Sequence, residues 1–153
     1  MGGSGSGRTG ARPVAEHALR LPIGILRSQL HTVYADGRGS LRHGQLHWSS
    51  GHTRVASCAY TLDHTPAGLL ATLQYSRQGT PVSTPIAITT SAPQLGGVRF
   101  WWTCPGCRRR CGILYAPRGF WRCRHCERIT YASSNASDSG FWERMERYVA
   151  RFH

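Results

Sequence analysis

The stretch that decides the fold is CPGCRRRCGILYAPRGFWRCRHC, residues 104–126, which holds five of the six cysteines of the chain. Four of these cysteines form two Cys-x-x-Cys pairs with fifteen residues between the pairs. Each such turn points two sulfur atoms to one side, and two turns joined by a hairpin complete a tetrahedron of thiolates. The pattern predicts a zinc ribbon over residues 98–133, which we call the cysteine module. The expected ligands of its one Zn²⁺ are Cys104, Cys107, Cys123 and Cys126, and an iron–sulfur cluster or a disulfide framework is the alternative.

The predicted metal site is structural rather than catalytic. Four thiolates fill the coordination sphere of zinc and leave no position open for water or a substrate. Small zinc domains depend on the metal for folding, with about 10–16 kcal/mol of apparent binding free energy in model peptides. The seven carboxylates of the chain are scattered and form no paired set. We therefore expect no catalytic residues, and a protein that is not an enzyme.

The fifth cysteine of the stretch, Cys111, alternates with Ile113 and Tyr115 on one face of a predicted strand. A free cysteine commonly packs as a small buried hydrophobe, and this is our interpretation of Cys111; replacement of one of the four ligands is the alternative. His125, inside the second cysteine pair, is expected to point away from the metal. Cys58 stands alone in another predicted strand and is expected to lie in the core.

Arginine surrounds the cysteines. The formal net charge of the chain is +12, and all 19 basic residues are arginine, whose planar fork binds phosphates and carboxylates in a bidentate manner. Between residues 98 and 131, eight arginines stand against a single carboxylate, Glu127. We expect this set to bind nucleic acid or an acidic surface of a host complex. Its members are Arg99, Arg108, Arg109, Arg110, Arg118, Arg122, Arg124 and Arg128.

Seven aromatic residues interleave with these arginines. They are Phe100, Trp101, Trp102, Tyr115, Phe120, Trp121 and Tyr131. Exposed aromatic rings beside arginine suit base stacking together with phosphate contact. A small metal-binding module has little core of its own, however, so we expect most of these rings to pack the module onto the rest of the protein.

The remainder of the chain predicts an α+β fold built on a small antiparallel β-meander. A short N-terminal helix is expected over Leu19–Leu30, where apolar residues recur at spacings of four, three and four residues. Segments rich in β-branched, aromatic or alternating apolar residues predict strands at 53–62, 68–76 and 81–90, with 45–50 as a fourth. Pro85 argues that its strand lies at a sheet edge or contains a bulge.

Both ends of the chain carry segments of distinct composition. Residues 1–18 begin with MGGSGSGRTGARP and predict a flexible basic arm. FWERMERYVARFH, within residues 134–153, has apolar residues at helical spacing and predicts a C-terminal amphipathic helix. The expected division is an arm (1–18), a helix with the meander (19–97), the cysteine module (98–133) and the terminal helix (134–153).

The sequence predicts no membrane partner. No stretch approaches the roughly 18 apolar residues that a membrane-spanning helix needs, and RLPIGIL (20–26) is too short and interrupted for an export signal. Cysteine pairs without an export signal favour a metal site over disulfides. We therefore expect a cytoplasmic protein of a bacterial cell, with no evident small-molecule substrate.

Several motifs suggest a family. They are GSGR (5–8), GGVRFWWTCP (96–105), the Arg109–Arg110 pair, the Leu114–Tyr115 pair, CRHC (123–126) and TYAS (130–133). In these motifs the chain resembles a group of short, functionally unassigned bacterial proteins that phages and other mobile elements often carry. The likeness covers both ends and the cysteine module, and the middle only by its strand pattern. The resemblance implies an apolar residue where Cys111 stands, no catalytic residues, and a regulator or an inhibitor of host machinery.

Two functions follow as expectations. The first is a non-catalytic zinc-ribbon protein that binds nucleic acid or a nucleoprotein complex through its arginines. The alternative is a mobile-element inhibitor of a host defence complex, similar to an anti-CRISPR protein, that acts by protein–protein binding. The sequence does not distinguish DNA, RNA and protein as the partner.

Overall fold

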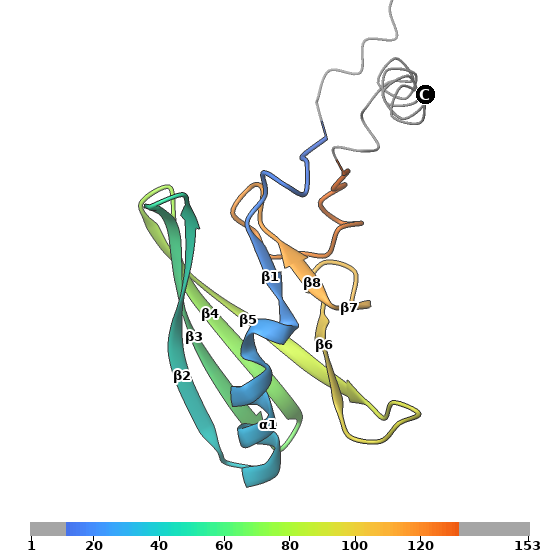
Figure 1. Ribbon diagram of the computed structural model, residues 1–153. Helices are drawn as coiled ribbons and strands as arrows, with labels where there is room; N and C mark the ends of the chain where they lie inside the picture. Colours follow the sequence, from blue (N-terminus) through green and yellow to red (C-terminus); the bar gives the residue numbers. More distant parts are fainter. Residues whose placement is uncertain (1–11, 132–153) are drawn as a thin grey trace, which may run out of the picture.

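The computed structural model describes residues 12–131, and its main element is a strongly twisted six-stranded antiparallel sheet (Figure 1). The strand order is β2-β3-β4-β5-β6-β7, so each strand pairs with its neighbours along the chain. The strands are β2 (Leu41–Ser50), β3 (Thr53–Thr65), β4 (Gly68–Arg77), β5 (Thr80–Ser91), β6 (Arg99–Thr103) and β7 (Arg110–Cys111). The predicted meander is confirmed, and all four predicted strand segments lie within β2–β5.

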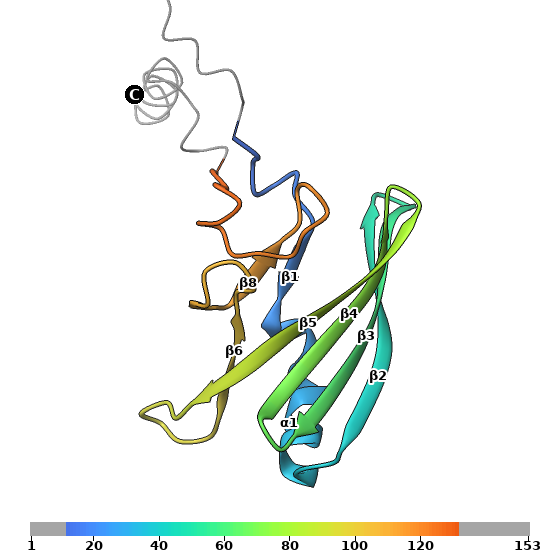
Figure 2. The same ribbon diagram turned by 180° about the vertical axis from the view of Figure 1, so that it is seen from behind.

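The core lies on one side of this sheet. Alternate residues of the central strands point to that side, and Leu62, Leu73 and Ile86 are buried there. The one α-helix among residues 12–131, α1 (Arg27–Asp36), covers the same side through Leu30 and Val33. Seen from behind, the other side of the sheet has no covering element among residues 12–131 (Figure 2).

The predicted helix over Leu19–Leu30 is wrong in its first half. Residues Arg20–Pro22 form strand β1, which pairs with β8 (Ile113–Tyr115) in a second, two-stranded sheet. A 3₁₀-helix over Ile23–Leu26 then leads into α1. The strand prevails because pairing with β8 buries Leu21 completely in the core, whereas Pro22 and Gly24 weaken a helix at this point.

Part of the predicted flexible arm is also held in the fold. Ala15 is only 2% exposed, and its N–H donates to the Thr130 carbonyl oxygen at 2.8 Å. The Thr130 N–H donates in turn to the Pro13 carbonyl oxygen at 3.0 Å. Residues 12–18 therefore belong to the folded structure because the end of the cysteine module binds them. The rest of the predicted arm lies outside the described residues, as does the predicted terminal helix over 134–153.

Pro85 lies at a local sheet edge, as predicted. It is paired with Thr72 of β4 on one side. On the other side β5 pairs with β6 only from Ile88 to Ser91. The missing N–H of proline therefore falls where β5 has no second neighbour, which is the position that a strand proline tolerates.

Gly44 of β2 is required by its cross-strand partner Tyr60. A Cβ atom at residue 44 would lie 2.6 Å from the Tyr60 hydroxyl oxygen and 2.7 Å from Cζ. We expect Gly44→Ala to lower the free energy of unfolding by about 1–3 kcal/mol, because the buried ring must shift. Urea denaturation measures this. Gly24→Ala is the matched control, since a Cβ there meets nothing within 4 Å, and an equal loss in both variants would contradict the explanation.

Candidate metal centre

Both cysteine pairs sit in tight turns of similar geometry. In the first turn the Arg108 N–H donates to the Cys104 carbonyl oxygen at 2.9 Å, and in the second the Glu127 N–H donates to the Cys123 carbonyl oxygen at 3.1 Å. An arginine in the left-handed backbone conformation ends each turn: φ is 63° at Arg108 and 52° at Arg128. Non-glycine residues rarely adopt this conformation, so the hydrogen bonds and packing of each turn must hold it.

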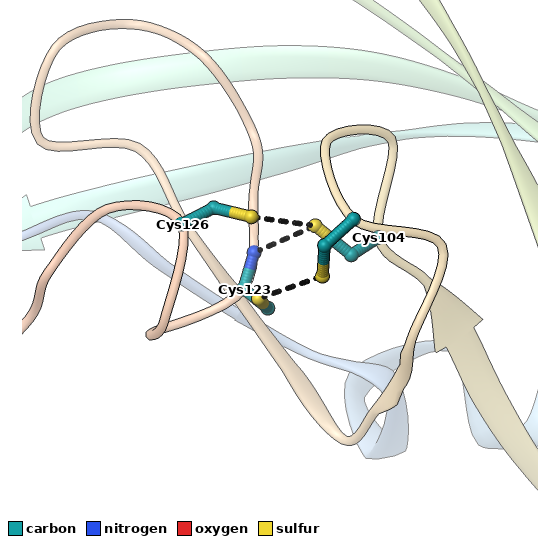
Figure 3. A group of neighbouring side chains, drawn as sticks. Cys104, Cys123 and Cys126 are labelled. Carbon is teal, nitrogen blue, oxygen red and sulfur yellow. Dashed lines mark hydrogen bonds between the residues drawn. The ribbon is translucent and has the colours of Figure 1, made fainter.

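The two turns bring four sulfur atoms together (Figure 3). The Sγ atoms of Cys104, Cys107, Cys123 and Cys126 all lie within 4.8 Å of one another. Cys104 Sγ is 3.8 Å from Cys126 Sγ, and Cys107 Sγ is 3.6 Å from Cys123 Sγ. A tetrahedron of sulfurs at about 2.3 Å from a metal has edges of about 3.8 Å. The four predicted ligands therefore fit one tetrahedral metal ion.

The pKa values of Cys104 and Cys126 are shifted in opposite directions. Burial raises the pKa of Cys104, but backbone N–H groups of Cys123, Cys107 and Gly106 more than offset this and bring it to about 7. The Cys123 N–H donates to Cys104 Sγ at 3.2 Å. Burial and the neighbouring thiols raise the pKa of Cys126. Backbone dipoles thus stabilise one thiolate, and holding four thiolates at this separation requires a cation.

The other cysteines and His125 lie outside the sulfur cluster, as predicted. Cys111 is half-buried against the main core beside Trp102, and burial first, then the neighbouring cysteines, raise its pKa to about 12. Cys58 is buried in the core, and burial raises its pKa to about 11. His125 is exposed and is not part of the metal-ligand group.

The cysteine module is joined to the rest of the fold by a continuous core. Trp102 of β6 is fully buried, and its Nε1–H donates to the Leu21 carbonyl oxygen of β1 at 3.0 Å. Trp121 lies between the cysteine turns in sequence and packs against Trp48 of β2, with ring centroids 5.4 Å apart. Leu114 and Trp121 belong to the same buried cluster as the sheet residues. The cysteine module therefore shares the main core. A second, small buried cluster also joins it to the N-terminal segment and consists of Ala15, Tyr115 and Ile129.

Most of the aromatic residues near the cysteines are structural, as expected. Phe100, Trp102, Tyr115 and Trp121 are buried. The more accessible rings each lie against an arginine guanidinium carbon: Trp101 at 4.1 Å from Arg99, Phe120 at 4.1 Å from Arg77 and 5.4 Å from Arg122, and Tyr131 at 5.6 Å from Arg124. Arginine side chains therefore already cover the accessible rings that the sequence suggested for base stacking.

The eight predicted binding arginines fall into separate groups. Arg99 and Arg124 lie over aromatic rings, as described above. Arg118 and Arg122 approach Glu127, with nitrogen–oxygen distances of 4.0 Å. The remaining four, Arg108, Arg109, Arg110 and Arg128, are exposed, and the structure places no ion pair on them within residues 12–131.

Two features of this region were missed by sequence reasoning. Arg77, at the end of β4, lies against Phe120 of the cysteine module, and no pattern near residue 77 signals that contact. Glu127 is buried, although a lone carboxylate beside a cysteine pair in a basic segment was a usable signal. The Arg77 contact becomes evident only when the module packs against the β4–β5 hairpin.

Comparison of the chain with protein-family models, with curated protein sequences and with solved structures found no match in any of the three. No helix within residues 12–131 combines the length and hydrophobicity needed to cross a lipid bilayer. The geometry of the site therefore carries the functional argument.

Proposed function

We propose that the cysteine module is a zinc ribbon that binds nucleic acid, alone or in a nucleoprotein complex, without catalysis. One observation carries the proposal. Arg108, Arg109 and Arg110 follow the first cysteine turn directly and are exposed, with no ion pair within the described residues. A metal that fixes this turn would present three charges that no carboxylate within residues 12–131 neutralises, and a polyanion is the matching partner.

Zinc is the metal that the ligand set favours. Four clustered cysteine sulfurs form a soft, tetrahedral donor set, which suits zinc or an iron–sulfur centre and not magnesium or calcium. All four positions belong to the protein, so the ion would have a structural role. Elemental analysis of the purified protein tests this directly. We expect one zinc per chain and no iron, and a content well below one zinc per chain would contradict the ribbon.

Replacing Arg108, Arg109 and Arg110 together with glutamine should weaken binding to nucleic acid. Three lost phosphate contacts reduce the slope of log K against log salt by about 2.7 for duplex DNA, since each contact contributes about 0.9. We expect affinity to fall by about tenfold to a hundredfold at low salt. Fluorescence anisotropy with short labelled DNA and RNA, measured between about 50 and 200 mM salt, gives both quantities.

The matched control removes three exposed arginines elsewhere, namely Arg27, Arg38 and Arg54. It lowers the net charge by the same amount and should reduce affinity far less. If wild-type protein binds neither DNA nor RNA at low salt, the proposed function is wrong. Recovery from host lysate of one stoichiometric protein complex that survives nuclease and high salt would instead favour an inhibitor that acts by protein–protein binding.

A further inference from the structure

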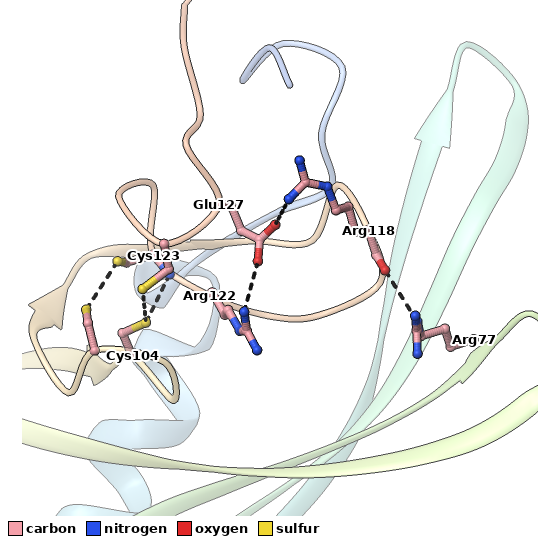
Figure 4. Close-up of polar contacts among 8 residues, drawn as sticks. Arg77, Cys104, Arg118, Arg122, Cys123 and Glu127 are labelled. Carbon is pink, nitrogen blue, oxygen red and sulfur yellow. Dashed lines mark hydrogen bonds and ion pairs between the residues drawn. The ribbon is translucent and has the colours of Figure 1, made fainter. Parts of the chain in front are cut away.

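Three arginines from two parts of the fold lie at the turn that carries Phe120. Arg77 ends β4, whereas Arg118 and Arg122 belong to the cysteine module (Figure 4). The Arg77 guanidinium carbon lies 4.1 Å from the centre of the Phe120 ring, and that of Arg122 lies 5.4 Å from it. Phe120 itself is 40% exposed. A surface cluster of positive charge thus spans the junction between the sheet and the module.

Close packing fixes Arg77 in this cluster. Its Nε–H donates to the Arg118 carbonyl oxygen at 3.4 Å. Its side chain also passes directly over Gly119, where an added Cβ would lie 3.0 Å from Arg77 Cδ and 3.1 Å from Cγ. Gly119 has a φ of +79°, which other residues rarely adopt. The turn between Arg118 and Phe120 is therefore shaped to receive the arginine from β4.

A buried carboxylate orients the other two arginines from the interior. The Glu127 side chain is 3% exposed, whereas those of Arg118 and Arg122 are 65% and 45% exposed. Arg118 Nη1 lies 4.0 Å from Glu127 Oε2, and Arg122 Nη1 lies 4.0 Å from Oε1. Charge-assisted hydrogen bonds measure about 2.7–2.9 Å. Glu127 therefore attracts both guanidinium groups without hydrogen-bonding either, and their exposed edges remain available to a ligand.

The charges in the cluster do not balance. The cluster holds three guanidinium groups and one carboxylate: Arg118 and Arg122 approach Glu127, and the structure gives Arg77 no ion pair within residues 12–131. A guanidinium group carries five N–H donors in a fork that matches two phosphate oxygens. An anion at the exposed edges would offset the excess positive charge of the cluster and supply the hydrogen-bond acceptors that Glu127, at 4.0 Å, does not provide.

We propose that Arg77, Arg118 and Arg122 form a site for a phosphodiester group of the nucleic-acid backbone. This inference rests on the proposed function and adds to it a contact from the sheet. The bound strand then touches both the cysteine module and β4, so the nucleic acid bridges the two parts of the fold. Glu127 acts as a positioning residue, because it holds Arg118 and Arg122 on their inner side.

The test compares Arg77→Gln with Arg54→Gln. Both substitutions remove one exposed or partly exposed arginine of the sheet and one charge, but only Arg77 belongs to the cluster. Fluorescence anisotropy with short labelled DNA duplex and single-stranded RNA is measured over a salt series. We expect Arg77→Gln to lower affinity about fivefold to tenfold and the salt slope for the duplex by about 1, and Arg54→Gln to change affinity less than about twofold.

The two failures are distinguishable. If wild-type protein binds and the Arg108–Arg110 variant weakens binding, but Arg77→Gln behaves as Arg54→Gln does, the phosphate site is wrong and the proposed function stands. If wild-type protein binds no nucleic acid, both are wrong. Equal zinc content and melting temperature in the two single variants establish that a difference in affinity is not a folding defect.

A second measurement addresses the site itself. Inorganic phosphate is titrated into full-length protein while the arginine Nε–H signals are followed by NMR. We expect the signals of Arg77, Arg118 and Arg122 to shift together, and the shifts of Arg118 and Arg122 to shrink in Arg77→Gln. Shifts confined to Arg108–Arg110, or spread evenly over all arginines, would overturn the site. Competition of inorganic phosphate with labelled nucleic acid then separates a backbone site from a site for free phosphate.

Discussion

Cys123→Ser is expected to release the metal and to unfold the cysteine module together with part of the core. Cys123 is buried, and its N–H donates to the sulfur of Cys104, so its loss removes a ligand from inside the cluster. Structural zinc supplies about 10–16 kcal/mol in small domains, which is as large as the whole stability of a typical protein, about 5–15 kcal/mol. Partial retention of the metal by three ligands cannot offset a loss of this size.

The effect should extend beyond the cysteine turns. Leu114 and Trp121 of the module are members of the main core cluster, so loss of the module exposes apolar surface on the sheet and on α1. We expect metal content to fall to near zero and the near-ultraviolet circular dichroism to collapse. Addition of a strong chelator to the wild-type protein should produce the same change.

Cys111→Ala is the matched control for this experiment. Cys111 lies outside the sulfur cluster and packs against the main core. The variant should keep one metal ion per chain. Its free energy of unfolding should fall by only about 1–2 kcal/mol, because the substitution removes one sulfur atom from a half-buried side chain. A Cys123→Ser protein that retains a full metal ion, or a Cys111→Ala protein that loses it, would contradict the assignment of ligands.

Trp102→Ala should cause the largest loss of stability among substitutions away from the metal. The ring is 0% exposed, and its Nε1–H satisfies the Leu21 carbonyl oxygen across 81 residues of sequence. Truncation of a buried tryptophan costs about 3–5 kcal/mol, and the loss of its hydrogen bond to the Leu21 carbonyl oxygen adds about 0.5–1.5 kcal/mol. Chemical denaturation followed by circular dichroism measures the change in the free energy of unfolding.

The neighbouring residue supplies the control. Trp101 points to the opposite side of the sheet, where it is partly exposed and donates to Ser91 Oγ at 2.8 Å. Trp101→Ala should lower the free energy of unfolding by about 1 kcal/mol, which is much less than the loss expected for Trp102→Ala. Trp102→Phe separates the two contributions, because it keeps most of the buried ring and removes only the N–H donor. Equal losses at positions 101 and 102 would show that Trp102 does not connect β1 to the sheet.

Local patterns predicted the parts of this fold that short-range physics determines. Alternation of apolar residues identified β3, β4 and β5 because one face of each strand is buried. The spacing of the cysteines identified the sulfur cluster, since four ligands in two tight turns have few other geometries. The position of Pro85 at a local sheet edge was also predictable, because proline has no N–H to donate to a second neighbouring strand.

Contacts between distant segments were not predictable in this way. The apolar spacing around Leu21 is also compatible with a helix, and only pairing with Leu114 makes it a strand. Arg77 gives no signal in its own neighbourhood, because its place beside Phe120 depends on how the module packs against the β4–β5 hairpin. The eight arginines of the cysteine module look like one set in the sequence. They form separate groups in the structure because the folding of the module decides which of them lie beside Glu127 or an aromatic ring.

The pairing of β1 with β8 sets the order of events during synthesis. Leu21 cannot meet Leu114 until the ribosome has made the intervening residues, which takes about 5–20 s at about 5–20 residues per second. Until then the nascent chain carries β1 and its apolar side chains without their partner. Cys123 and Cys126 emerge after β8, so binding of a metal and closure of the core would come together as one late step. Cells short of that metal would accumulate chains that are fully synthesised but not fully folded.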